Sequence, residues 1–147
     1  MQSPQSETCQ YSLRCLQCGT EHDERETCTF CAKCGGQLEV AFNYAQLARR
    51  LNYQLLKGSP ISALKYLPFF PIRDYSKIVT LNEGNTAIFR AAKLGKALGI
   101  KNLYIKNESV NPTGCFKDRG SMVELTKALE LGAKAVCVAS TGNMAAS

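Results

Sequence analysis

The stretch that decides the fold runs from residue 102 to residue 147 and reads NLYIKNESVNPTGCFKDRGSMVELTKALELGAKAVCVASTGNMAAS. Alternating residues over 102–108 predict a strand, and apolar residues at helical spacing predict an amphipathic helix over 118–133 that ends at Gly132. The apolar run 134–140 predicts a second, buried strand. Strand, helix and strand in this order indicate a right-handed βαβ unit with parallel strands, and therefore an α/β fold.

Two loops follow the predicted strands and emerge at the same edge of the sheet, where open α/β sheets bind ligands. The first loop, NPTGCFK, ends at Lys117, and the second contains STGN at 140–143. We therefore expect Lys117 and Asn143 to face one crevice. The start of the helix after Lys117 disfavours a charged amine, so this lysine is a candidate nucleophile towards a carbonyl group. Ser140–Asn143 would form a cradle for a carboxylate or phosphate.

The residues alone leave a plainer alternative open. In that interpretation Lys117 is a surface lysine and STGN is an ordinary helix cap, which is a common use of such residues.

The first forty residues are rich in cysteine, with six of the eight cysteines between Cys9 and Cys34. The motifs CLQCG and CAKCG contain four of them, at Cys15, Cys18, Cys31 and Cys34. Four thiolates from two such turns predict a closed tetrahedral zinc site, which is structural because no coordination position stays open. The gap from Cys18 to Cys31 is short for a zinc ribbon, so His22 and Cys28 are substitute ligands. A disulfide cluster is the other alternative.

Composition narrows the class of protein. The chain has 147 residues, 45% of them apolar, and a formal charge of +6 that is spread without basic runs. Acidic residues outnumber basic ones between Cys15 and Cys34, which argues against nucleic-acid binding by that segment. No apolar run approaches the about 20 residues of a membrane span, and the N-terminus lacks the apolar part of a secretion signal. We therefore expect a cytoplasmic location and no membrane partner.

The middle of the chain predicts helices joined by an irregular connection. NYAQLARRLNYQLL, at 43–56, has apolar residues at helical spacing and Asn43 as N-cap. Prolines interrupt the stretch that follows, LNEGNTAIFR predicts a turn, and AAKLGKALGI predicts a short helix that ends at Gly99.

Three of these motifs resemble one enzyme family. NPTGCFKDRG resembles the NPTGSFKDRG segment that carries the cofactor lysine of threonine synthases, and ASTGNMAAS resembles their asparagine loop. LNEGNTAIFR is similar to their LGEGNTPL stretch, and the CGG and LEV of the cysteine-rich start resemble the zinc-ribbon-like extension of many members. The resemblance implies a fold-type II pyridoxal phosphate enzyme of the tryptophan synthase β-like class. Residues 1–40 would form the zinc-ribbon-like module and residues 41–147 the N-terminal part of the catalytic domain.

The resemblance also implies an activity, the conversion of O-phospho-L-homoserine and water to L-threonine and phosphate. Lys117 would bind pyridoxal 5'-phosphate as a Schiff base and transfer protons, with Phe116 beside it. Asn143 would hydrogen-bond the cofactor's phenolic oxygen. Three residues would line the side of the substrate's anionic group: Ser140, Thr141 and Gly142.

Three positions depart from the family's usual residues, since Cys115 replaces a serine, Met144 a threonine and Ala87 a proline. The family's loop for the cofactor phosphate lies beyond Ser147, so we expect a fragment with little activity alone, completed by the missing C-terminal part or present in a homodimer. A threonine dehydratase or a cysteate-synthase-like enzyme is the alternative within the family. A non-catalytic zinc-ribbon interaction module is the alternative outside it.

Overall fold

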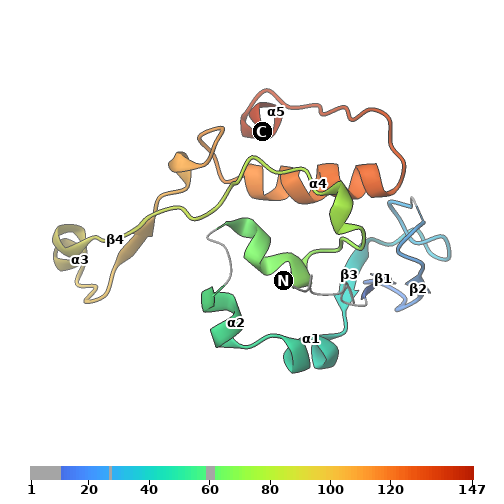
Figure 1. The fold of residues 1–147 in the computed structure, drawn as a ribbon, viewed down its shortest axis with the longest axis horizontal. Coiled ribbons are helices and arrows are strands. Elements are labelled where there is room, and N and C mark those ends of the chain that lie inside the picture. Colours follow the sequence, from blue (N-terminus) through green and yellow to red (C-terminus); the bar gives the residue numbers. More distant parts are fainter. Residues whose placement is uncertain (1–10, 27, 59–61) are drawn as a thin grey trace.

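The cysteine-rich start forms a small antiparallel sheet. A computed structural model describes residues 11–26, 28–58 and 62–147, so Cys9 lies outside the described residues (Figure 1). Strands β1 (Tyr11–Cys15), β2 (Glu21–His22) and β3 (Leu38–Phe42) pair in the order β2-β1-β3. Leu13 on the central strand pairs with His22 on one side and Val40 on the other. The sheet ends where the cysteine turns begin, because Cys15 is the last residue of β1.

The helix expected over 43–56 is two helices. The Asn43 side chain accepts a hydrogen bond from the Gln46 N–H at 3.0 Å, so its prediction as N-cap of α1 (Tyr44–Arg50) is confirmed. Leu51 then adopts an extended backbone and ends α1. The Asn52 carbonyl accepts from the Leu56 N–H at 3.2 Å and starts α2 (Tyr53–Gly58). The single-helix prediction was wrong here, since asparagine favours helix ends over helix interiors.

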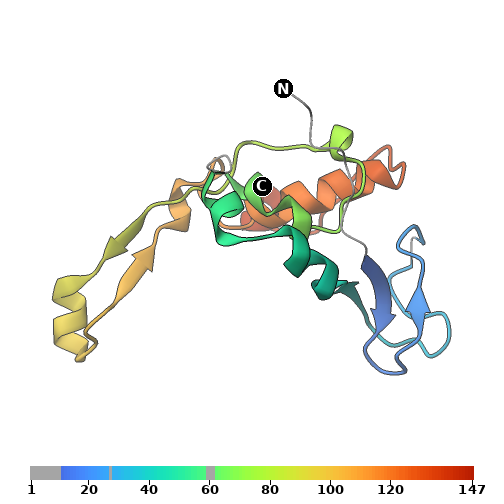
Figure 2. The ribbon, with the colours of Figure 1, turned by 60° about the horizontal axis from the view of Figure 1, so that its bottom comes forward.

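A hairpin arm projects from the rest of the chain (Figures 1 and 2). Two 3₁₀ helices, Ala63–Phe69 and Tyr75–Lys77, precede it. Strand β4 (Ile88–Arg90) pairs antiparallel with β5 (Tyr104–Lys106), and α3 (Ala92–Leu98) lies between them. Gly99 ends α3 with a left-handed backbone at φ 70°, which confirms its prediction as the C-cap.

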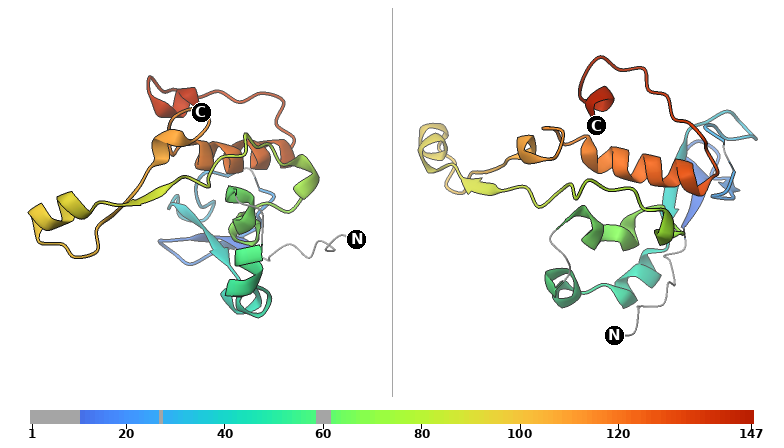
Figure 3. Two further views of the ribbon diagram at one scale, coloured as in Figure 1. Left: turned by 60° about the vertical axis from the view of Figure 1, so that its left-hand side comes forward. Right: turned by 45° about the horizontal axis from the view of Figure 1, so that its top comes forward.

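The predicted parallel βαβ unit is not formed among the described residues. The predicted helix is present as α4 (Asp118–Glu130), but the predicted strand over 102–108 is reduced to β5, whose partner is the antiparallel β4. Residues 134–140 run back along α4 as an unpaired segment, exposed over 134–139, that leads to α5 (Asn143–Ala146) (Figures 1 and 3). The prediction of a buried strand over 134–140 is therefore wrong for the structure described. A strand needs a neighbour that satisfies its N–H and C=O groups, and no described residue pairs with this segment.

The sheet module docks on the C-terminal half of α4. The Tyr11 hydroxyl donates to the Pro71 carbonyl at 2.8 Å and accepts from Lys127 Nζ at 2.6 Å. Arg73 forms an ion pair with Glu24 of the module at 2.5 Å. These contacts tie the cysteine-rich module to the helix that begins beside Lys117.

A membrane-spanning helix is not found in the described part of the chain, where every helix is too short or too polar to cross a bilayer.

Candidate cofactor site and metal centre

Lys117 occupies the turn that starts α4. It is the N-cap residue, and its carbonyl accepts from the N–H groups of Gly120 and Ser121 at 2.8 and 2.9 Å. The side chain is half-buried, and Nζ lies 5.1 Å from the centre of the exposed Phe116 ring. Among the residues that the structure describes, no carboxylate lies within ion-pair distance of this amine. The amine therefore lies at a helix start where no described residue provides a charged partner.

Asp118 fixes the loop before Lys117. Its carboxylate is buried and accepts from the Thr113 N–H at 2.9 Å and from the Thr113 hydroxyl. Gly114, with φ at 79°, closes the turn by donating to the Asn111 carbonyl at 2.8 Å. An acidic group in the first turn also interacts favourably with the helix dipole. The loop and the helix start are therefore one unit.

The asparagine loop lies against this unit. Cys115 Sγ is 3.7 Å from the Asn143 carbonyl oxygen, and the hydroxyl of Ser147 hydrogen-bonds that of Ser121 in α4. The two loops expected to share one edge are therefore adjacent, although no parallel sheet positions them. Cys115 is 5% exposed, so it fills a small packed space where the family has serine.

The remaining predicted residues of this loop face outward. Thr141, Gly142 and Asn143 are exposed, and Ser140 is half-buried with its hydroxyl accepting from the Gly142 N–H at 3.2 Å.

A cavity of about 140 Å³ lies nearby, along the next turns of α4. It is lined by Ser121, Met122, Ser147 and the buried Glu83, among others, and not by Lys117. It is smaller than the about 300 Å³ at which ligand pockets usually begin.

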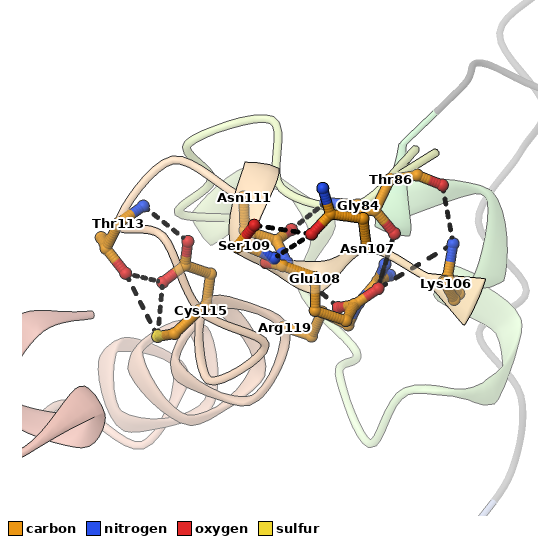
Figure 4. Close-up of polar contacts among 11 residues, drawn as sticks. Gly84, Thr86, Lys106, Asn107, Glu108, Ser109, Asn111, Thr113, Cys115 and Arg119 are labelled. Atoms are coloured by element: carbon orange, nitrogen blue, oxygen red, sulfur yellow. Dashed lines mark hydrogen bonds and ion pairs between the residues drawn. The ribbon is translucent and has the colours of Figure 1, made fainter. Parts of the chain in front are cut away.

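A carboxylate that the sequence analysis missed holds the region together (Figure 4). Glu108 accepts two hydrogen bonds from Arg119, at 2.7 and 2.9 Å. It also accepts from the Thr86 hydroxyl at 2.6 Å and from Asn111 Nδ2 at 3.0 Å. Asn111 Oδ1 in turn accepts from the Gly84 N–H at 2.9 Å. Each of these residues lies in or beside a motif already quoted, but nothing in the sequence indicates that they contact one another.

This network joins three segments that are far apart in the sequence. Gly84 and Thr86 belong to the EGNT loop, Glu108 and Asn111 precede the lysine loop, and Arg119 is in the first turn of α4. The backbone of Gly84 has φ at 92°, and a Cβ there would lie 2.8 Å from the Ala63 nitrogen, so only glycine fits. The network therefore positions the first turn of α4, and Lys117 with it.

The Glu108 network predicts how the stability of the fold depends on pH. Hydrogen bonds from Arg119 lower the pKa of Glu108 from 4.5 to about 2, although partial burial opposes the shift. A carboxyl whose pKa is lowered by folding stabilises the fold above its unfolded pKa, so this contribution should be lost as the pH falls from about 4.5 to about 2. Glu108→Gln should cost about 1.5–3 kcal/mol at pH 7, and the difference from the original chain should vanish in that acid range.

Urea unfolding at several pH values measures this effect. Glu124→Gln, which removes an exposed carboxylate of α4 outside the network, is the matched control and should show no such difference. A Glu108→Gln cost that stays constant down to pH 2 would show that the ionised carboxylate does not stabilise this network.

Four cysteines form the second candidate site. Cys15 Sγ lies 3.5 Å from Cys34 Sγ, and Cys18 Sγ lies 3.7 Å from Cys31 Sγ. All four sulfur atoms lie within 4.8 Å of one another. Tetrahedral zinc with bonds of about 2.3 Å separates its sulfur ligands by about 3.8 Å, so the cluster fits a zinc ion.

The two cysteine turns have the same backbone. The Gly19 N–H donates to the Cys15 carbonyl at 3.0 Å, and the Gly35 N–H donates to the Cys31 carbonyl at 2.8 Å. Both glycines have φ near 70°, at 70° and 72°, a conformation that side chains disfavour. This explains why each Cys-x-x-Cys pair is followed by glycine.

The four cysteines influence one another's ionisation. Hydrogen bonding to Thr20 lowers the pKa of Cys18 to about 6. A backbone hydrogen bond with Gly36 favours the Cys34 thiolate, but the neighbouring thiols Cys18 and Cys15 oppose it, and the pKa of Cys34 is raised to about 12. One thiolate therefore forms at the expense of another, and a divalent ion would stabilise all four.

Comparisons with known proteins agree with the motifs. Residues 79–147 match the family described as "Pyridoxal-phosphate dependent enzyme". The chain is 46% identical over 134 residues to a threonine synthase of Methanocaldococcus jannaschii, covering 91% of this chain and 33% of that protein. It is 42% identical over 136 residues to one from Methanosarcina acetivorans, with 92% and 33% covered. A threonine synthase of Synechocystis is 46% identical over 82 residues, which cover 55% of this chain and 22% of that protein.

The matches cover most of this chain but only part of each relative. The chain spans about a third of the length of the first two of these relatives. Their matches leave at most 13 of the 147 residues unaligned (147 − 134), so they include most of the cysteine-rich module.

Proposed function

Because residues 79–147 belong to the pyridoxal-phosphate dependent enzymes, and the chain is threonine synthase-like over about nine-tenths of its length, we propose that it contributes the cofactor lysine of a threonine synthase. The proposed reaction converts O-phospho-L-homoserine and water to L-threonine and phosphate. The observation that carries the proposal is the contact between the two loops, with Cys115 Sγ 3.7 Å from the Asn143 carbonyl. It supports an amine and an asparagine acting on one bound molecule.

The residues present fit pyridoxal phosphate at its aldehyde end. Lys117 offers an amine that no described carboxylate pairs with, at a helix start where the backbone of α4 is fixed by Asp118. When bound, the cofactor would supply an electron sink that stabilises negative charge on the substrate's carbon atoms. Lys117 would hold the cofactor covalently and afterwards move protons at the substrate's Cα and Cβ.

The loop at residues 140–143 would bind and orient the cofactor and the substrate. The Asn143 side chain, exposed beside Cys115, would donate a hydrogen bond to the cofactor's phenolic oxygen. The hydroxyls of Ser140 and Thr141 and the backbone N–H of Gly142 would bind the substrate's anionic group. Gly142 has nothing within 4 Å of where a Cβ would stand, which leaves the backbone open to a ligand. Phe116, 55% exposed, would cover the Lys117 side chain.

The four-cysteine module would be structural in this enzyme. Its sulfur spacing supports zinc as the ion, and its four ligands leave no position for substrate. The contacts of Tyr11 and Glu24 with Lys127 and Arg73 support a role in holding the far end of α4.

A chimera tests the proposed function. This chain would replace the matched third of the Methanocaldococcus jannaschii threonine synthase, to which it is 46% identical. With pyridoxal phosphate and phosphohomoserine, the chimera should release phosphate and form threonine. Ammonia release from threonine would indicate a dehydratase instead, and sulfite consumption would indicate a cysteate-synthase-like enzyme. A folded chimera that binds the cofactor but catalyses none of the three reactions would contradict the proposal.

A further inference from the structure

Three metal-binding side chains outside the four-cysteine cluster converge in the loop after β2. His22 Nδ1 lies 3.5 Å from Glu26 Oε2, and Cys28 Sγ lies 3.7 Å from the same oxygen. The three ligand atoms all lie within 4.8 Å of one another. Nitrogen, oxygen and sulfur donors therefore meet at a point separate from the four thiolates.

Hydrogen bonds within the loop bring these side chains together. The Asp23 carbonyl accepts from the Glu26 N–H at 3.0 Å, and Asp23 Oδ1 accepts from the Arg25 N–H at 2.8 Å. Arg25 Nη2 also pairs with Asp23 Oδ2 at 2.7 Å. The backbone reverses between Asp23 and Glu26, so the Glu26 carboxylate returns to the His22 ring.

The distances from the Glu26 oxygen to the His22 nitrogen and the Cys28 sulfur match those around a tetrahedral ion. Zinc binds nitrogen and oxygen at about 2.0–2.2 Å and thiolate sulfur at about 2.3 Å, and tetrahedral angles then place nitrogen about 3.4 Å and sulfur about 3.6 Å from oxygen. The observed separations, 3.5 Å for His22 and Glu26 and 3.7 Å for Cys28 and Glu26, agree with these values. The two separations that involve Glu26 therefore fit one tetrahedral ion, and the ligand atoms of His22 and Cys28 lie within 4.8 Å of each other.

The His22 ring connects this group with the four-cysteine cluster. Its Nε2 lies 3.3 Å from Cys31 Sγ, within hydrogen-bond distance. Its Nδ1 lies on the other side of the ring, 3.5 Å from Glu26 Oε2, and a cation between these two atoms would bind both of them. His22 thus contacts a ligand of the first ion through one nitrogen and is free to bind another ion through the other.

We propose that His22, Glu26 and Cys28 bind a second divalent transition-metal ion next to the four-cysteine site. The mixed donor set suits Zn²⁺ better than Mg²⁺ or Ca²⁺, which prefer oxygen ligands. A neutral imidazole, a carboxylate and a thiolate balance the ion's two positive charges and leave a fourth position open to water. The His22 side chain is 8% exposed and that of Glu26 50%, so the ion enters from the Glu26 side. The two residues that were candidates to replace a cysteine ligand would serve a site of their own.

Metal content of the full 147-residue chain tests the proposal. The chain is loaded with excess Zn²⁺, passed through metal-free buffer, and its zinc is counted by mass spectrometry. Two ions per chain are expected, with one in Glu26→Gln and one in Cys28→Ser. Glu21→Gln and Cys137→Ser are matched controls, exposed and outside the group, and should keep two.

Cobalt absorption separates the two sites in the same variants. The thiolate-to-cobalt band of the four-cysteine site should persist in Glu26→Gln and Cys28→Ser, which also shows that the module is folded. One ion in the original chain would overturn the proposal, as would two ions that survive both substitutions, because the second would then be adventitious. Loss of both ions in both variants would also overturn it, since Glu26 and Cys28 would then belong to the first site.

Discussion

Substitution of Lys117 by alanine is expected to lower phosphate release by the chimera at least about 10³-fold. Without the amine, the cofactor loses its covalent anchor and the substrate loses the group that moves protons at Cα and Cβ. The fold should be unaffected, because the start of α4 is held by the Lys117 carbonyl and by Asp118. Among the described residues, no hydrogen bond of the Lys117 side chain contributes to it. Steady-state phosphate release measures the effect.

Two controls accompany that substitution. Lys134→Ala removes an exposed lysine beyond α4 and should keep full activity. Far-UV circular dichroism of Lys117→Ala should match the unaltered chimera. Activity within tenfold of the unaltered chimera in Lys117→Ala would show that another amine carries the cofactor.

Removal of the proposed zinc ion should unfold the cysteine-rich module. Its buried residues are few, among them Tyr11, Cys15 and Cys31, and three short strands with so small a core do not hold together alone. Zinc binding to four thiolates contributes on the order of 10 kcal/mol to such modules. A strong chelator, or Cys34→Ser, should therefore collapse the amide NMR signals of residues 11–42 into the unfolded region.

The loss should extend to α4, because Lys127 of α4 contacts Tyr11 of the module. Arg73, which pairs with Glu24 of the module, also donates its N–H to Glu130 of α4. We expect faster hydrogen exchange in the last turns of α4 and little change around Asp118. Cys137→Ser, an exposed cysteine outside the module, should leave the spectrum unchanged. Dispersed signals for residues 11–42 after complete metal removal would show that the module folds without an ion.

Local signals in the sequence predicted local structure well. The Cys-x-x-Cys-Gly turns, the Asn43 cap, the Gly99 cap and the α4 helix each depend on a few neighbouring residues, and each is present. Strand pairing was predicted poorly, since β5 pairs with β4 and residues 134–140 pair with no described residue. Apolar character indicates that a segment is stable when buried, but it does not identify the strand with which that segment pairs.

The sequence likewise predicted only part of the candidate site. The motifs identified Lys117 and Asn143, and the structure places their loops in contact. The Glu108 network was not predicted, because its members lie in three segments and only the fold brings Arg119 within 2.7 Å of that carboxylate. The spacing of motifs along the chain predicts which side chains can react. The contacts that hold those side chains in position depend on the fold, and the spacing does not predict them.

The most direct test of the account is borohydride trapping on the 147-residue chain itself. The chain is incubated with pyridoxal phosphate, reduced and digested, and the labelled peptide is identified by mass, with Lys117→Ala as control. Label concentrated on Lys117, and lost in the control, is the predicted result. Label spread evenly over Lys117, Lys127, Lys134 and the other lysines, unchanged in the control, would contradict the assignment of Lys117 as the cofactor lysine.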